Sequence, residues 1–208
     1  MVTLEMQTPR GLARVRLDKV RGARGALLLG HGAGGGVDAR DLQATSEIAQ
    51  SQGFSVALVE QPYRVAGRRA PAPAAQLDVA WLAVAQRLAA RELRRLPMIF
   101  GGRSMGARVA CRTAPAGEAA AVLCLAFPLL PPRRATAAKP PVSRLAELEG
   151  TGLPTLVVQG GRDSFGIPPA GPGRSVIEVT GDHSLRSDLA GVRAAVDHWL
   201  ATLSLPGT

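Results

Sequence analysis

Residues 97–113 have the sequence PMIFGGRSMGARVACRT, and this stretch decides the fold. It begins with a short apolar run typical of a buried strand, turns at glycines, and continues in residues that favour a helix. Ser104 lies at the turn, between Gly102 and Gly106, in the pattern G-x-S-x-G. Larger flanking side chains would collide with the neighbouring strand and helix. The pattern therefore predicts that Ser104 projects its hydroxyl above the carboxyl end of a sheet, at the N-terminus of the following helix.

Apolar runs of strand length recur on both sides of this turn and alternate with helical stretches. Such alternation is typical of an α/β protein with a mostly parallel sheet. The N-terminal residues instead form two period-2 stretches, 2–6 and 13–17, around a Thr-Pro-Arg-Gly turn, which predicts an antiparallel hairpin at one sheet edge. With this hairpin we expect about eight strands. The other predicted strands are residues 25–30, 54–59, 97–101, 120–127, 153–159 and 175–179.

Two longer stretches, residues 75–96 and 185–203, are predicted helices, because each carries one apolar stripe at helical spacing. Residues 107–113 form a shorter predicted helix after the serine turn. A tryptophan stands in each long stripe, and we expect Trp81 and Trp199 to anchor the core and not to stack on a ligand. The stripe residues are Leu77, Trp81, Val84 and Leu88 in the first helix and Leu189, Val192, Val196, Trp199 and Leu203 in the second.

The composition is that of a globular protein. Of 208 residues, 46% are hydrophobic and 20% charged, which excludes intrinsic disorder. The length fits a single domain spanning residues 1–208. Cys111 and Cys124 lie inside apolar runs, which excludes a disulfide scaffold and indicates a reducing compartment. Residues 128–141, PLLPPRRATAAKPP, are predicted to be a surface loop or minimal lid between two strands.

The net charge of +9, from 25 Lys and Arg against 16 Asp and Glu, raises the possibility of a nucleic-acid partner. The basic residues are nearly all arginines, scattered in pairs such as Arg68-Arg69 and Arg94-Arg95, so we expect no nucleic acid. No signal-peptide pattern begins the chain, and no run of about eighteen apolar residues occurs. We therefore expect a cytoplasmic protein with no membrane partner.

A serine hydroxyl is a poor nucleophile unless a base takes its proton, so the three histidines decide whether Ser104 can react. His183 lies in a glycine-containing loop after the predicted strand 175–179, at the same carboxyl edge as Ser104. It is the predicted base, and the alternative is a surface loop histidine. We expect His31 to hold a loop through hydrogen bonds and His198 to be structural.

The histidine needs a carboxylate that orients it and stabilises its positive charge. Asp163 follows the predicted strand 153–159 in a glycine-rich loop and is the predicted third member. Asp182 is the rival, although a carboxylate next to the histidine in sequence usually points away from its ring. Asp163 could instead be a turn residue or the partner of Arg162. The three residues follow in the order Ser104, Asp163, His183.

The run HGAGGG at residues 31–36 predicts an oxyanion hole. Its glycines let the main chain approach a substrate and aim N–H groups inward. The predicted donors are the backbone N–H groups of Met105 and Ala33, with Gly34 as the alternative to Ala33 and a candidate substrate contact. The run lacks the glycine spacing of a dinucleotide-binding loop and the Gly-Lys-Ser/Thr of a P-loop, which disfavours phosphate binding.

Taken together, these motifs resemble the α/β-hydrolase superfamily and its small dienelactone-hydrolase-like members. More narrowly, the chain is similar to hydrolases grouped with the testis-expressed proteins and to the hydrolase-like domain of a non-specific-lethal chromatin complex subunit. The resemblance implies a three-layer αβα sandwich of about eight strands, a Ser–Asp–His triad, and no cofactor or metal. Dienelactone hydrolase has a cysteine nucleophile, so its substrate is not transferred to this chain. The segments that carry the resemblance are residues 31–36, 61–64 (QPYR), 101–108 (GGRSMGAR), 159–166 (QGGRDSFG) and 181–185 (GDHSL).

No long insertion follows the sixth strand, where lipases of this fold carry a cap, so we expect neither a large cap domain nor a deep acyl tunnel. The expected activity is hydrolysis of a small-molecule ester or thioester through an acyl-enzyme. Arg103, Tyr63 and Arg64 are candidate contacts to an anionic group on the substrate. The alternative is that Arg103 and Arg108 pair with nearby acids. The alternative to an enzyme is a non-catalytic interaction protein that keeps the hydrolase scaffold.

Overall fold

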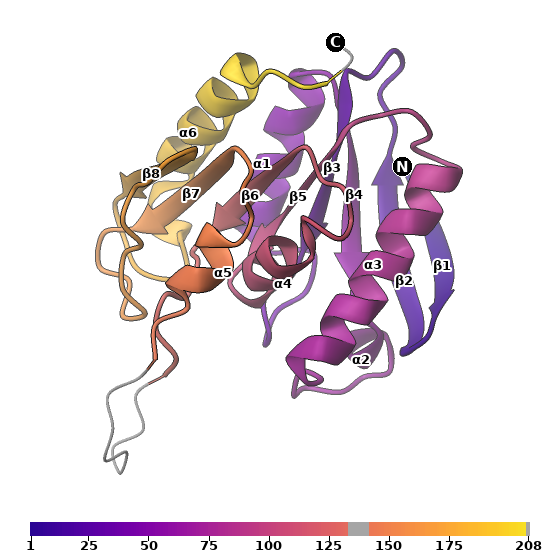
Figure 1. The fold of residues 1–208 in the computed structure, drawn as a ribbon, viewed down its shortest axis with the longest axis horizontal. Helices are drawn as coiled ribbons and strands as arrows, with labels where there is room; N and C mark the ends of the chain where they lie inside the picture. Colours follow the sequence, from indigo (N-terminus) through magenta and orange to yellow (C-terminus); the bar gives the residue numbers. More distant parts are fainter. Residues whose placement is uncertain (133–141, 207–208) are drawn as a thin grey trace.

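The computed structural model describes residues 1–132 and 142–206 (Figure 1). Eight strands form one sheet in the order β1-β2-β4-β3-β5-β6-β7-β8. The first two strands form an antiparallel hairpin, β2 pairs antiparallel with β4, and the remaining neighbours are parallel. This confirms the predicted mostly parallel sheet with an N-terminal hairpin. The strands are β1 (Val2–Thr8), β2 (Gly11–Asp18), β3 (Gly25–Gly30), β4 (Phe54–Glu60), β5 (Met98–Arg103), β6 (Ala121–Leu125), β7 (Thr155–Gly160) and β8 (Arg174–Val179).

Helices cover both faces of the sheet, which gives the three-layer αβα sandwich (Figure 1). On one face α1 (Arg40–Ser51) packs against α6 (Leu189–Thr202). On the other face α4 (Met105–Thr113) contacts α3 and α5. No large cap domain stands over the sheet in the described part of the chain. The remaining helical elements are α2 (Pro62–Val65), α3 (Ala74–Ala90), α5 (Leu145–Glu149) and the 3₁₀ turn η1 (Arg186–Asp188).

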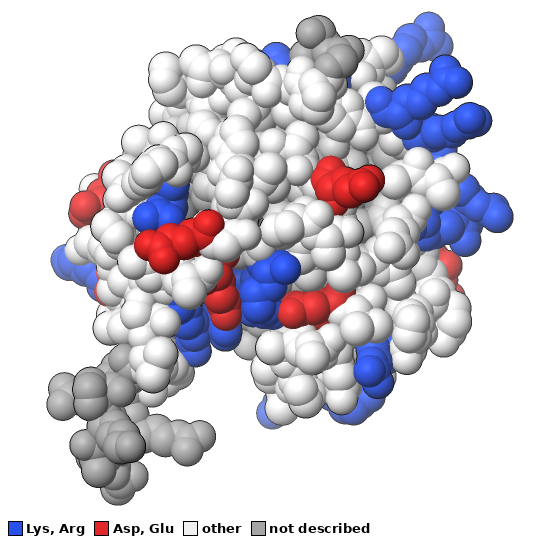
Figure 2. Space-filling model, in the orientation of Figure 1, with Lys and Arg blue, Asp and Glu red and all other residues white. Residues whose placement is uncertain are grey.

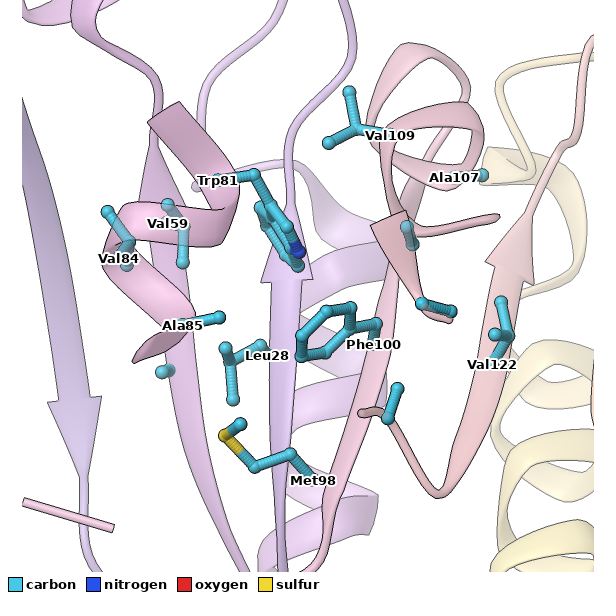
Figure 3. Packing of buried hydrophobic residues seen from close by; sticks show 14 of the residues in the cluster. Leu28, Val59, Trp81, Val84, Ala85, Met98, Phe100, Ala107, Val109 and Val122 are labelled. Carbon is cyan, nitrogen blue, oxygen red and sulfur yellow. The ribbon is translucent and has the colours of Figure 1, made fainter. Parts of the chain in front are cut away.

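Strand β3 shows why the central strands are continuous apolar runs: helices cover the sheet on both sides. Leu28 belongs to the core between the sheet and α3 and α4 (Figure 3), whereas Leu27 belongs to the core under α1 and α6. Trp81 of α3 is 1% exposed, and its ring meets Phe100 edge to face at 5.5 Å between centroids. Trp199 packs partly buried against the second core. Both tryptophans therefore serve the core, as predicted.

The first long helix ends earlier than predicted, at Ala90 and not at residue 96. The following residues form turns, in which Leu93 is 1% exposed and its N–H bonds to the carbonyl of Leu88. Arg95 then takes a positive φ of 67°. The chain reverses here because it must enter β5, so the demand of the sheet overrides the helical pattern.

Helix α1 was not predicted, since its buried face is not purely apolar. Asp41, Thr45 and Ser46 are buried there beside Leu42 and Ala49. The short helices α2 and α5 were also missed. Residues 133–141 of the predicted loop 128–141 lie outside the described residues. Within the described residues, no helix combines the length and apolarity needed to cross a membrane.

Charge is unevenly spread over the face drawn in Figure 2. Basic side chains gather on the side where the N-terminal hairpin and the C-terminal end of α3 lie, whereas elsewhere on this face acidic and basic side chains are interspersed. The absence of a nucleic-acid partner stays a prediction.

Candidate active site

Ser104 stands on the sharp turn between β5 and α4, with φ 54° and ψ −108°. That left-handed backbone is costly for a non-glycine residue and is typical of functional turns. The flanking glycines are required by close packing. A Cβ at Gly106 would lie 2.2 Å from the carbonyl oxygen of Gly30, and one at Gly102 would lie 2.5 Å from the same atom. The helix can press against β3 only because both positions lack a side chain.

Three side chains from separate strand ends meet at this turn. The Nε2 atom of His183 lies 2.9 Å from Oγ of Ser104, and its Nδ1 atom lies 2.7 Å from Oδ2 of Asp163. The side chain of Asp163 is fully buried, and that of His183 is 20% exposed. The structure thus brings together the three residues predicted as a triad.

The rival carboxylate, Asp182, is engaged elsewhere. Its Oδ1 accepts hydrogen bonds from the backbone N–H and the hydroxyl of Ser184. These bonds lower the pKa of Asp182. The geometry therefore favours Asp163 over Asp182 as the partner of the imidazole.

The Asp163 carboxylate is fixed from two further sides. Oδ1 accepts from the backbone N–H of Phe165 at 2.9 Å, and Oδ2 accepts from Nε2 of Gln159 at 2.7 Å. Nε2 of Gln159 also lies 3.1 Å from the carbonyl oxygen of Phe127 and 3.0 Å from that of Gly166. Gln159 is fully buried at the end of β7. The motif at residues 159–166 includes Gln159 but indicates no role for it, because a glutamine inside an apolar strand carries no local signal of its partner.

An aromatic ring flanks the imidazole. The ring of Phe165 lies 4.5 Å from that of His183 between centroids, tilted by 59°. Phe165 also accepts a backbone bond from Leu130, which joins this loop to the segment after β6. The contact restricts the rotation of the His183 side chain and keeps an apolar wall beside it.

His31 holds the glycine-rich loop, as predicted. The backbone N–H of Gln61 donates to Nε2 of His31 at 3.1 Å, so the proton of a neutral ring resides on Nδ1. Nδ1 donates in turn to the carbonyl of Gly32 at 2.8 Å. In a trans peptide the N–H points opposite to the C=O, so the N–H of Ala33 points away from the buried ring. Burial lowers the pKa of His31, which keeps the ring neutral.

The same loop lies against the nucleophile and is tied to Tyr63. A Cβ built on Gly32 would lie 3.7 Å from Cβ of Ser104. The Tyr63 hydroxyl donates to the carbonyl of Ala33 at 2.9 Å and lies 4.0 Å from Sδ of Met105. Burial raises the pKa of Tyr63 to about 12, so the hydroxyl remains a donor at neutral pH. Tyr63 thus contacts both residues predicted to supply oxyanion donors.

The arginines predicted as anion contacts have different environments. Nε of Arg103 lies 2.8 Å from Oδ2 of the buried Asp41, and Nη2 donates to the carbonyl of His183 at 3.0 Å. These contacts favour the alternative in which Arg103 pairs with an acid. Arg64 has no ion-pair partner among residues 1–132 and 142–206, and its Nε is buried without a hydrogen bond. Asp41 was missed because the helix that carries it was missed.

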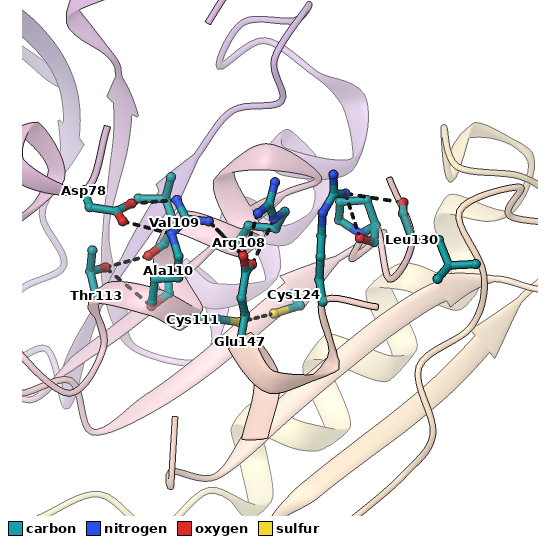
Figure 4. Close-up of polar contacts among 12 residues, drawn as sticks. Asp78, Arg108, Val109, Ala110, Cys111, Thr113, Cys124, Leu130 and Glu147 are labelled. Atoms are coloured by element: carbon teal, nitrogen blue, oxygen red, sulfur yellow. Dashed lines mark hydrogen bonds and ion pairs between the residues drawn. The ribbon is translucent and has the colours of Figure 1, made fainter. Parts of the chain in front are cut away.

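The helix behind the serine is anchored by a second group of charges (Figure 4). Arg108 makes a two-point contact with Glu147 of α5, at 2.9 and 2.6 Å. Arg112 bonds Asp78 of α3 at 2.8 and 2.6 Å and also reaches Glu147. Arg108 therefore pairs with an acid, which agrees with the alternative stated for it in the sequence analysis. Together these ion pairs connect α4 to α3 and α5.

Cys111 of α4 and Cys124 of β6 are buried free thiols with their sulfur atoms 3.4 Å apart (Figure 4). The hydrogen bond with Cys111, together with burial, raises the pKa of Cys124. In the described part of the chain, no group of three or more His, Cys, Asp or Glu side chains could hold a metal ion.

What the site offers is a hydroxyl, a base in contact with it, and a carboxylate behind the base, which together can activate an oxygen nucleophile.

Comparisons with known proteins agree with this fold. The sequence profile of an alpha/beta hydrolase domain family matches residues 23–188. A serine hydrolase without a lid from Xanthomonas campestris has a TM-score of 0.73 and 19% identity, with 100% of this chain and 96% of that chain covered. Dienelactone hydrolase from Anabaena variabilis has a TM-score of 0.74 and 16% identity, with 96% of each chain covered.

Est1E from Butyrivibrio proteoclasticus has a TM-score of 0.76 and 14% identity, covering 97% of this chain and 98% of its own. At such identities these likenesses establish the fold alone. No curated protein sequence matches the chain significantly.

Proposed function

The chain belongs to the α/β-hydrolase domain family, and on that basis we propose that it is a serine hydrolase that cleaves a small ester or thioester. The observation that carries this proposal is the continuous contact from Ser104 Oγ through the His183 ring to the Asp163 carboxylate, at 2.9 and 2.7 Å. Both distances are those of hydrogen bonds, so the base can take the hydroxyl proton without rearrangement.

In the first half-reaction, Nε2 of His183 accepts the proton of Ser104 while Oγ forms a bond to the substrate carbonyl carbon. The carbonyl π electrons move to oxygen, and the N–H groups of Ala33 and Met105 stabilise the oxyanion. The Met105 N–H suits this role because it opens α4, where the first N–H groups have no partner within the helix. When the oxyanion collapses, the bond to the leaving alcohol or thiol breaks, and His183 returns its proton to that group.

In the second half-reaction, water replaces the departed group. His183 removes a proton from the water as its oxygen attacks the acyl carbon, and the oxyanion forms at the same two N–H groups. Collapse breaks the bond to Ser104 Oγ, which takes the proton back from His183 and releases the acid. Asp163 keeps the Nδ1 proton in place and balances the charge of the imidazolium in both steps, with Gln159 and Phe165 holding the carboxylate.

The surroundings of the candidate active site support a small substrate. No large cap covers the site among the described residues, and Est1E, a structural relative, has been solved with ferulic acid bound. Arg64, which has no acid partner within residues 1–132 and 142–206, remains the candidate for binding an anionic group on the substrate. Tyr63 would act on the substrate through the oxyanion loop, because its hydroxyl donates to the carbonyl of Ala33, and Gly34, which is exposed in that loop, remains a candidate substrate contact.

The test is labelling with a fluorophosphonate probe together with hydrolysis of p-nitrophenyl acetate. The wild-type chain should label once and hydrolyse the ester, and Ser104→Ala should lose both properties. Ser175→Ala is a matched control. Ser175 is an exposed serine near the amino end of the edge strand β8, whereas Ser104 follows the carboxyl end of the central strand β5. Labelling that persists in Ser104→Ala would overturn the assignment of the nucleophile. A wild-type chain that neither labels nor hydrolyses esters, thioesters or lactones would favour the alternative, a non-catalytic interaction protein.

A further inference from the structure

We propose that Arg103 is a positioning residue for His183. Its guanidinium, paired with Asp41, holds the backbone of the loop that carries His183 where the imidazole can hydrogen-bond to Ser104. This inference rests on the proposed function, in which His183 is the base. It assigns to Arg103 a task inside the protein, in place of the contact with an anionic substrate that the sequence suggested.

The guanidinium joins segments that are far apart in the sequence. Nε pairs with Oδ2 of Asp41 at 2.8 Å, and Nη2 donates to the carbonyl oxygen of His183 at 3.0 Å. Nη1 lies over Gly32, where a Cβ would come within 3.0 Å of it. The residue before the nucleophile thus touches the base loop, the oxyanion loop and the start of α1 at once.

The Asp41 end of this bridge is a buried ion pair, in which Oδ2 of Asp41 accepts no hydrogen bond from the described residues. Asp41 is 2% exposed, the Arg103 side chain is 19% exposed, and Oδ1 of Asp41 accepts the backbone N–H of Leu42. Burial raises the pKa of Asp41, while the charge of Arg103 and the bond from Leu42 oppose that rise. Separating the pair would leave a carboxylate buried without its cation, which is strongly unfavourable. Arg103 is therefore held in place and is not free to follow a substrate.

The His183 end of the bridge is the part that needs support. The loop between β8 and η1 contains two positive φ angles, 127° at Gly181 and 54° at Leu185. A left-handed leucine is strained, and such a backbone persists only where surrounding contacts enforce it. The hydrogen bond from Nη2 of Arg103 to the carbonyl oxygen of His183 restrains this loop at the residue that carries the imidazole. A shift of about 1 Å at a reacting group is enough to slow a reaction about 100-fold.

Arg112 provides a matched control within the same chain. Its side chain is likewise 19% exposed and pairs with acids, Asp78 and Glu147, although these are 22% and 18% exposed where Asp41 is 2% exposed. Within the described part of the chain, the side-chain partners of Arg112 lie on α3 and α5, and none lies in the His183 loop. Substituting either Arg103 or Arg112 therefore removes an ion pair. Only substitution of Arg103 also removes the hydrogen bond to the backbone of His183.

The experiment compares Arg103→Met and Arg112→Met by kcat, KM and Tm on p-nitrophenyl acetate. We expect Arg103→Met to lower kcat about 10- to 100-fold with KM within about twofold of wild type. Arg112→Met should also lower Tm, because it too breaks ion pairs, but it should keep kcat within about twofold. The proposal is overturned if Arg103→Met keeps wild-type kcat, if it raises KM alone, or if Arg112→Met loses as much kcat.

If Arg103→Met does not fold, Asp41→Asn decides the question, because asparagine keeps the shape of the side chain and removes the charge that fixes the guanidinium. We then expect kcat to fall about 3- to 10-fold at unchanged KM, and full activity would overturn the proposal. Ser104→Ala separates the two levels. Hydrolysis that survives Ser104→Ala refutes the proposed function, whereas an inactive Ser104→Ala beside a fully active Arg103→Met refutes only the role of Arg103.

Discussion

The backbone N–H of Gln61 donates a hydrogen bond to Nε2 of His31, 3.1 Å away, and so joins the loop after β4 to the loop after β3. The ring is completely buried, and its other nitrogen donates to the carbonyl of Gly32. A proton on Nε2 would face the N–H of Gln61 and break this arrangement. The glycine-rich loop therefore keeps its shape only while His31 is neutral.

The first prediction concerns acid stability. Burial lowers the pKa of His31 below 6.5 in the folded chain, so the unfolded chain takes up a proton near that pH and the folded chain does not. Wherever the unfolded state binds more protons than the folded state, the free energy of unfolding decreases as the pH is lowered. It should therefore drop as pH falls below about 6.5, by at most about 1.4 kcal/mol per pH unit. Urea denaturation at pH values of about 7.5 and 5.5 measures this drop.

Two variants test whether His31 is the source. In His31→Gln the side chain no longer titrates, so the variant should lose less stability between the two pH values than the wild type does. His198→Gln, which changes an exposed histidine of α6, should keep the wild-type dependence. An identical pH dependence in His31→Gln and the wild type would show that another group is responsible.

The second prediction separates the two aspartates near His183. Asp163→Asn should lower kcat about 10³- to 10⁴-fold, because an amide, unlike the carboxylate, does not stabilise the tautomer and the positive charge that His183 needs as the base. Asp182→Asn should stay within about twofold of wild type, because the Asp182 carboxylate bonds only to Ser184 in the described contacts. Ester hydrolysis under saturating substrate measures both. Equal losses in the two variants would contradict the assignment.

The third prediction concerns the oxyanion loop. Tyr63→Phe removes the hydroxyl that donates to the carbonyl of Ala33. One neutral hydrogen bond is worth about 1 kcal/mol, so kcat should fall about 5-fold while KM changes little. Steady-state kinetics on a neutral ester gives the split. A rise in KM with unchanged kcat would instead place Tyr63 in direct contact with the substrate.

The fourth prediction concerns packing at the serine turn. Gly106→Ala would place a methyl group 2.2 Å from the carbonyl oxygen of Gly30, a backbone atom that cannot yield without moving β3. We expect a loss of about 3 kcal/mol or more, or failure to fold. Gly36→Ala, at a glycine with no atom within 4 Å of the added Cβ, should change stability by less than about 1 kcal/mol. Thermal melts compare the two, and a stable Gly106→Ala would contradict the close approach of α4 to β3.

Local patterns were enough to predict the sheet. The central strands are buried on both faces, so their continuous apolar runs mark them in the sequence, and β3 begins and ends where the pattern indicated. Helix α1 escaped because it buries Asp41, Thr45 and Ser46, which no hydrophobic periodicity reveals. The end of α3 was misplaced because residues 91–96 follow the requirements of β5 and not their own helical spacing.

The sequence by itself determined the types of chemical group and their order along the chain: a serine between glycines, an aspartate and a histidine after later strands, and a glycine-rich run near the start. These depend on local steric and periodic rules, which neighbouring residues express. Only the tertiary structure decided which partner each side chain takes, such as Asp41 for Arg103 and Gln159 for Asp163. Hydrogen bonds select among all groups within about 3 Å in space, and distance along the chain carries no information about that choice.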